Sequence, residues 1–206
     1  MKNIALIILL TFFSCSLYQD NDEPDIFFQF SDFEILELGK SFSDMIISDV
    51  QNAIYLSDYN NNSLLKINTQ NSLLIEQHTF VGSHPIALDI NSDESIIAIA
   101  HEGESSILIL NSQDLEILNS FSVSLMNMND LAFINDTTLI ISSKTDPSCI
   151  TLNLISGEET TQSVLNGELA MDREGQILYV ATSSSLKKYN WDGLRLNQDP
   201  NISDPY

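Results

Sequence analysis

The chain repeats one pattern of apolar segments four times between residues 43 and 199. Each unit has an apolar segment, a polar turn, a second apolar segment, a loop and a third apolar segment that closes on an asparagine. The closing residues are Asn68, Asn111, Asn153 and Asn190, separated by 43, 42 and 37 residues. This period strongly constrains the fold, because a unit of about 40 residues buries its core only against neighbouring units.

The polar turns indicate that each unit is built from antiparallel strands. The first turn of each unit is rich in Asn, Asp, Ser and Gly, which cap tight hairpins through their side chains or tolerate a positive φ. A more polar stretch after each closing asparagine predicts a fourth, half-exposed strand, at residues 73–76, 115–118, 160–164 and 194–197. We therefore predict an all-β array of about four four-stranded antiparallel units, at residues 43–82, 85–124, 128–165 and 168–199.

Two hairpins carry a resemblance to a known family. Residues 91–100 and 171–181 each join an acidic turn to an apolar strand and resemble the repeats of YVTN-type and related WD-like β-propellers. Gly175 matches the glycine of that pattern, and its usual proline is absent from both segments. The resemblance implies a propeller, and such rings usually close with more than four blades. Four units therefore leave open a complete four-bladed ring or an incomplete part of a larger one.

The segment before the repeats resembles the outer strand of a blade. Residues 32–36 parallel residues 114–118, since both begin with Asp and continue with the same alternation of apolar and acidic residues. Many propellers close their ring by lending such an N-terminal strand to the last blade. The sequence predicts a repeat domain over residues 27–206 that includes this segment.

The first residues predict an exported lipoprotein. Lys2 precedes an apolar run at residues 4–13, whose helical length of about 15 Å is half of a bilayer core, which is typical of a signal peptide. The segment that ends in Ser14 and Cys15 resembles a bacterial lipobox of Bacteroidota type. This implies a signal peptide at 1–14, a lipidated Cys15 and an acidic tether at 15–26. The alternative is an ordinary signal peptide in which Cys15 is one more apolar residue.

Charge restricts the partners. The chain has 8 Lys and Arg against 29 Asp and Glu, a formal net charge of −21. This excludes a protein that binds nucleic acid through its phosphates, because that interaction needs clustered cations. The expected partners are a membrane, reached through the lipid anchor, and a protein or small-molecule ligand. We expect an outer-membrane lipoprotein of the cell envelope, facing the periplasm or the cell surface.

Four residues at the starts of the units are the candidates for ligand binding. By propeller geometry, the residues that precede or begin each first strand lie near the central channel, and three of these four are acidic. We predict that they converge on the axis and bind a ligand, against the alternative that they are solvated loop residues. They are Asp44, His84, Asp130 and Glu168.

No residue set predicts catalysis, a metal site or a cofactor. Residues 58–62 begin like a calcium loop, but Ser63 and Thr69 stand where that loop needs Gly and Glu, so a turn is predicted. His101 and Glu102 are adjacent and lack the spacing of a ligand set. Cys149 begins an apolar strand and is expected to be a buried, unreactive thiol.

Together these features predict an envelope lipoprotein whose propeller repeats act as a binding or scaffold module. The alternative is a propeller enzyme of lactonase or dehydrogenase type, or a truncated fragment of one. The fold itself does not decide between these functions, since function resides in the loops and residues of a site.

Overall fold

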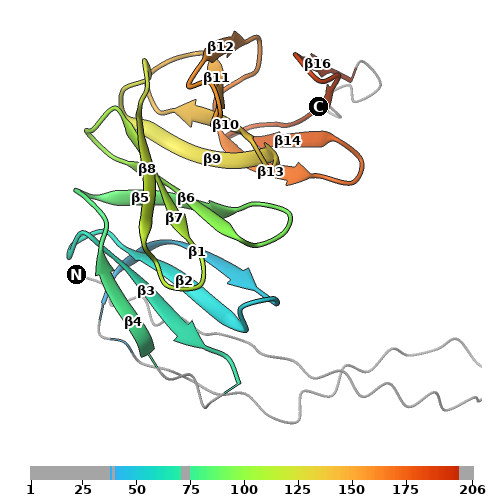
Figure 1. Cartoon of the computed structure of the whole chain (residues 1–206). Coiled ribbons are helices and arrows are strands. Elements are labelled where there is room, and N and C mark those ends of the chain that lie inside the picture. The colour runs from blue at the N-terminus through green and yellow to red at the C-terminus, as the bar shows by residue number, and fades with distance from the viewer. Residues whose placement is uncertain (1–37, 39, 71–74, 200–206) are drawn as a thin grey trace, which may run out of the picture. The chain divides into compact units, whose positions relative to one another are not determined.

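A computed structural model describes residues 38, 40–70 and 75–199 (Figure 1). The predicted signal peptide, Cys15, the tether and residues 32–36 lie outside the described residues. All described strands belong to the compact unit that begins at Phe42. Among the described residues there is no helix with the length and apolar character needed to span a membrane.

The described strands form four separate four-stranded sheets, each antiparallel and each in chain order. This confirms the predicted all-β class and the four four-stranded units. The strands are β1 (Phe42–Ser48), β2 (Ala53–Asp58), β3 (Ser63–Asn68), β4 (Ile75–Phe80); β5 (Pro85–Ile90), β6 (Ile96–His101), β7 (Ser106–Asn111), β8 (Ile117–Ser122); β9 (Met128–Asn135), β10 (Thr138–Ser143), β11 (Cys149–Asn153), β12 (Glu159–Gln162); and β13 (Glu168–Asp172), β14 (Ile177–Ala181), β15 (Leu186–Trp191), β16 (Leu196–Gln198).

The predicted turns form as expected, while the outer strands of the second and fourth sheets each begin two residues later than predicted. Asn52, Glu94 and Gln176 adopt positive φ in the first turns of their sheets. Leu115, predicted to begin a fourth strand, also has a positive φ of 59°, and its side chain is 2% exposed. It therefore belongs to the turn before β8, where its apolar side chain is drawn into the core between the first two sheets.

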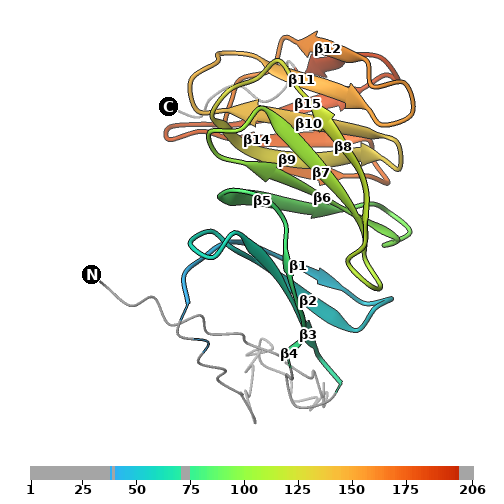
Figure 2. The same ribbon diagram turned by 60° about the vertical axis from the view of Figure 1, so that its left-hand side comes forward.

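The first strands of the four sheets lie side by side in chain order. β1 packs against β5, β5 against β9, and β9 against β13. The other strands of each sheet extend outward from this row, so that the sheets follow one another like the blades of a propeller (Figure 1 and Figure 2).

The hydrophobic core consists of three layers, each between two consecutive sheets. The strand β6 shows why its sequence is apolar without interruption. Ile97 and Ile99 pack toward the first sheet, whereas Ala98 and Ala100 pack toward the third. A strand that is buried on both faces needs apolar residues at successive positions rather than at alternate ones.

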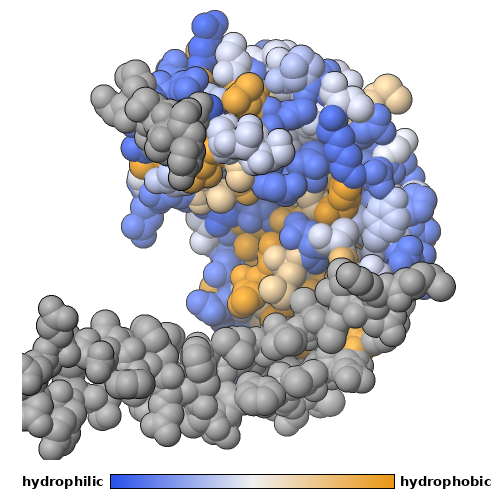
Figure 3. Space-filling view, turned by 180° about the vertical axis from the view of Figure 1, so that it is seen from behind, coloured by the Kyte–Doolittle hydropathy of each residue, from blue (hydrophilic) through white to orange (hydrophobic). Residues whose placement is uncertain are grey.

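The row of sheets is open at its ends. The middle strands β5 and β9 are largely buried, whereas β1 and β13 alternate between half-buried and exposed residues. Met45 and Ile47 of β1 are 39% and 52% exposed, since no described sheet packs on that side. Figure 3 shows the domain hollowed on one side, with hydrophobic side chains gathered in the hollow.

Candidate functional site

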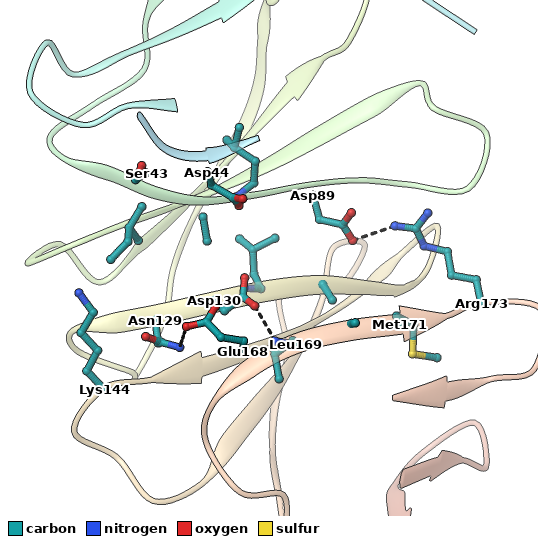
Figure 4. A pocket seen from close by; sticks show the side chains of 16 residues that line it. Ser43, Asp44, Asp89, Asn129, Asp130, Lys144, Glu168, Leu169, Met171 and Arg173 are labelled. Carbon is teal, nitrogen blue, oxygen red and sulfur yellow. Dashed lines mark hydrogen bonds and ion pairs between the residues drawn. The ribbon is translucent and has the colours of Figure 1, made fainter. Parts of the chain in front are cut away.

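A cavity of about 600 Å³ lies where the four innermost strands meet. Residues of β1, β5, β9 and β13 line it, together with Lys144 from the loop after β10 and Arg173 from the turn after β13. We call it the axial cavity. Its volume falls within the range of about 300–1,000 Å³ that is common for small-molecule sites. Figure 4 shows its lining, in which the carboxylates of Asp44, Asp130 and Glu168 lie near one another and that of Asp89 faces Arg173.

Asp44 joins the first sheet to the second. Its Oδ1 accepts a hydrogen bond from the backbone N–H of Met45 at 2.7 Å, and its Oδ2 accepts one from the N–H of Leu88 at 2.6 Å. Met45 follows it in β1, whereas Leu88 lies in β5, the innermost strand of the next sheet. The carboxylate therefore satisfies a backbone donor on each side of a sheet boundary.

The same arrangement recurs at the two other sheet boundaries. Asp89 accepts from Ile90 of its own strand at 2.8 Å and from Phe133 of β9 at 2.7 Å. Asp130 accepts from Leu131 at 2.8 Å and from Leu169 of β13 at 2.6 Å. One aspartate at each boundary thus links consecutive innermost strands, and we call these three hydrogen-bonded links the aspartate clasps.

Burial changes the protonation of the clasp carboxyls. It raises the pKa of Asp44, Asp89 and Asp130 above the ordinary value of 3.8, and raises the pKa of Asp130 to about 7. The backbone N–H donors lower these pKa values but do not offset the desolvation. The negative charges of Asp44 and Glu168 further raise the pKa of Asp130.

Glu168 differs from the three clasp residues. It is the exposed first residue of β13, and its Oε1 accepts a hydrogen bond from the side-chain amide of Asn129 at 3.2 Å. Among the carboxylates that line the axial cavity, it is the one for which the described residues supply no backbone N–H donor. Its carboxylate is therefore the most available of the four for a ligand.

Two cations lie at the edges of the cavity, and each already has an acidic partner. Arg173 pairs with Asp89 at 2.8 Å and also donates to the backbone carbonyls of Phe133 and Ile90, which ties the turn of the fourth sheet to the second and third. Lys144 pairs with Glu102 at 2.7 Å. The cavity lining consequently retains an excess of negative charge.

The structure brings together three of the four predicted site residues. Asp44, Asp130 and Glu168 line the axial cavity, and His84 does not. His84 lies before β5 with a φ of 50°, and its ring lies 4.6 Å from that of Tyr59. The strand register explains this placement. In the first sheet, Asp44 pairs with Ser57. The equivalent pair in the second sheet is Ala87 with Ala100, and Ala87 lies three residues after His84 in the chain.

Asp89, Lys144 and Arg173 line the cavity and were not among the residues predicted from the sequence. Asp89 carried a recognisable signal, since it is a charged residue within an apolar strand, between Leu88 and Ile90. Lys144 and Arg173 gave little signal, because long side chains from loops reach the cavity only through the assembled fold. Arg173 contacts Asp89, which lies 84 residues before it in the chain.

The remaining candidates have structural positions. His101 is buried, and its Nε2 lies 2.8 Å from the carbonyl oxygen of Val81. Cys149 is a free, buried thiol whose pKa burial raises to about 12. Asp58 closes the turn after β2 by accepting from the backbone N–H of Asn61 at 3.1 Å. Within the described parts of the chain, no group of His, Cys, Asp and Glu has the arrangement of a metal site.

Comparison with known proteins supports the fold. No protein-family model and no curated protein sequence matches the chain. Hydrazine synthase from Kuenenia stuttgartiensis is similar in structure with a TM-score of 0.63 and 11% identity, over 75% of this chain and 47% of that one. The WD40 repeats of RRP9 give 0.61 and 16%, over 77% and 51%. A putative 6-phosphogluconolactonase from Bacteroides fragilis gives 0.59 and 15%, over 77% and 53%.

These similarities show the architecture alone. The array has the fold of a WD40-like β-propeller. The chain spans about half the length of the solved structures that it matches. This agrees with the four sheets of an unclosed ring, since a complete propeller needs a neighbour for every blade.

Proposed function

We propose that the protein is an envelope lipoprotein whose propeller sheets bind the cationic group of a protein or small-molecule ligand in the axial cavity. One observation carries the proposal. Asp44, Asp130 and Glu168 come from three different sheets and line one cavity. Residues far apart in the sequence that meet in a concave site are the usual starting point for a binding hypothesis.

The charge of the cavity supports a cationic ligand. Four carboxylates line it against two cations, and each cation is paired with an acidic residue. The clasp carboxyls have raised pKa values because they are desolvated, and at Asp44 and Asp130 neighbouring carboxylates raise them further. A bound ammonium group would relieve that repulsion, and hydrogen bonds between ions of opposite charge are the stronger ones.

The hydrogen bonds support binding more than catalysis. Asp44 and Asp130 each accept two backbone N–H groups, so their oxygens are held in place as acceptors. A general base must be placed to take a proton from a substrate. A propeller enzyme of lactonase or dehydrogenase type is the alternative function. It would have to rely on Glu168, whose one hydrogen-bond partner among the described residues is a side-chain amide.

The proposal of a lipoprotein rests on the lipobox-like sequence before Cys15. Metabolic labelling with a fatty acid, followed by membrane fractionation, tests it. We expect that Cys15→Ala abolishes labelling and moves the protein to the soluble fraction, because one residue carries every acyl chain of the anchor. Continued labelling of this variant would contradict the proposal.

Nuclear magnetic resonance with cyclohexylammonium tests the ligand site. We expect shifts at the backbone N–H signals of Leu88 and Leu169, because these groups donate to Asp44 and Asp130. Glu168→Gln should weaken binding by about tenfold, which equals about 1.4 kcal/mol. Glu174→Gln, in the turn between β13 and β14 and outside the cavity lining, is the matched control.

Two results, one from this titration and one from thermal unfolding, would contradict the proposal. Cyclohexanol has the same ring and no charge, and equal shifts with both compounds would show that charge is not recognised. Thermal stabilisation by Ca²⁺ or Mg²⁺, with no response to the ammonium compound, would instead favour the alternative of a metal-dependent enzyme.

A further inference from the structure

A second cavity of about 570 Å³ continues from the axial cavity between the third and fourth sheets. The two cavities share Asn129, Lys144 and Glu168 in their linings. A ligand held at Glu168 therefore has room to extend into the second cavity. We call the second cavity the side cavity.

The lining of the side cavity is rich in short hydroxyl and amide side chains. Asn129 and Asn166 supply amides and Ser183 supplies a hydroxyl, whereas the hydroxyls of Ser143 and Thr182 are engaged in hydrogen bonds with neighbouring backbone groups. Such a surface offers hydrogen-bonding groups side by side with apolar contact area. It therefore suits a ligand that itself carries several hydroxyl groups.

The internal hydrogen bonds orient the two amides. The Nδ2 of Asn129 donates to Glu168 at 3.2 Å, and the Nδ2 of Asn166 donates to the backbone carbonyls of Ser143 and Asp146 at 2.5 and 2.8 Å. The amide oxygens of both side chains are consequently the groups left to accept from ligand hydroxyls.

Lys144 supplies a donor between the two cavities. Its Nζ lies 2.7 Å from Glu102, and the hydroxyl of Tyr59 donates to the other carboxylate oxygen of Glu102. These contacts hold the ammonium group while using one of its three N–H donors. The remaining donors can reach ligand oxygens, because Lys144 lines both cavities.

We infer that the axial and side cavities together bind an amino sugar. This inference rests on the proposed function, since the protonated amine would lie among Asp44, Asp130 and Glu168. The sugar hydroxyls would then donate to the amide oxygens of the side cavity and accept from Lys144. A site built around hydroxyl groups rejects an analogue that lacks them, because its polar groups are then left unpaired.

Calorimetric titration of the full chain with three probes tests the inference. Glucosamine carries the amine and the hydroxyls, cyclohexylammonium carries the amine alone, and glucose carries the hydroxyls alone. We expect glucosamine to bind at least about tenfold more tightly than either of the others. Lys144→Met should weaken glucosamine more than cyclohexylammonium and so remove that advantage. Lys187→Met, outside both cavity linings, is the matched control.

The outcomes separate this inference from the proposed function. Equal affinities for glucosamine and cyclohexylammonium would overturn the amino-sugar inference and leave the cation site intact. The inference also fails if a short lysine peptide such as Gly-Lys-Gly binds more tightly than glucosamine. Failure of both amines to bind would overturn the proposed function itself, as would glucose binding as tightly as glucosamine.

Discussion

The carboxylate of Asp130 accepts the backbone N–H of Leu169 at 2.6 Å and so joins the third sheet to the fourth. Its other oxygen accepts the N–H of Leu131 in its own strand at 2.8 Å. Asp44 and Asp89 repeat this arrangement at the other two boundaries. The residues that supply the charge of the candidate site therefore also hold the innermost strands together.

Loss of a clasp should destabilise the domain. Asp130→Ala leaves the N–H groups of Leu131 and Leu169 without their acceptor, at a cost of about 1–3 kcal/mol in the free energy of unfolding. Urea unfolding at pH 5 measures it, since the pKa of about 7 keeps the carboxyl protonated and removes the desolvation cost of its charge. Glu116→Ala, an exposed carboxylate of the second sheet, should change the free energy by less than about 0.5 kcal/mol. Equal effects of the two variants would show that the clasp contributes nothing.

Stability should fall as the pH rises from 4 to 7. The pKa of Asp130 is about 7 in the folded protein against an ordinary value of 3.8. The stability that this difference contributes is therefore fully present below pH 3.8 and is lost as the pH rises through about 7. Each unit of pKa difference corresponds to about 1.4 kcal/mol. Asp44 and Asp89, whose pKa values are also raised, act in the same direction.

Asp130→Asn isolates this dependence in a urea unfolding series across that pH range. The side chain of the variant cannot ionise, so its free energy of unfolding, relative to that of the wild-type protein, should increase as the pH increases. A constant difference between the two proteins would contradict the raised pKa.

The four sheets were predictable because the turn residues and the apolar pattern of the strands indicate the same hairpins. The strand β6 illustrates this, since its uninterrupted apolar run follows the turn at residues 91–95, where Asn91 accepts from the N–H groups of Ser95 and Ile96. Local turn chemistry and burial on both faces together determine such a hairpin. Both signals are contained within a few neighbouring residues.

The site was only partly predictable, because it depends on register. His84 was matched to Asp44 as the residue that precedes or begins a first strand, but the pairing shows that Ala87, three residues later, is the residue equivalent to Asp44. Asp89 stands two residues farther along its strand than Ala87, the true counterpart of Asp44. Ala87 follows Asp44 by 43 residues, the same spacing as Asn68 and Asn111, so the repeat period contained this correspondence, whereas the convergence of Asp89 and Arg173 appears only in the assembled fold.

Cys149 should resist alkylation in the folded protein. Burial raises its pKa to about 12, so at pH 8 roughly one thiol in 10,000 is ionised, against about one in four for a free cysteine. Mass spectrometry after iodoacetamide treatment measures the modification, in a Cys15→Ser background so that one thiol is observed. We expect slow labelling in buffer and rapid labelling in urea. Equal rates in both conditions would contradict burial of the thiol.

Arg173 should stabilise the domain mainly through Asp89. It pairs with this half-buried carboxylate at 2.8 Å across two sheet boundaries, and its charge lowers a pKa that desolvation raises. Arg173→Met removes the cation but keeps much of the apolar side chain. The pKa of Asp89 should then rise further, so the loss of stability should be larger at pH 8 than at pH 5, where the carboxyl can take a proton.

A double-mutant cycle with Asp89→Asn tests the coupling between these two residues. In the Asp89→Asn background, Arg173→Met should lose its extra cost at pH 8, leaving the cost of its bonds to the carbonyls of Phe133 and Ile90. Urea unfolding of the four proteins at both pH values gives the interaction energy, which we expect to exceed about 1 kcal/mol at pH 8. Additive effects at pH 8 would mean that Arg173 acts through the carbonyls alone. The third and fourth sheets would then be tied together by its contact with Phe133, independently of charge in the cavity.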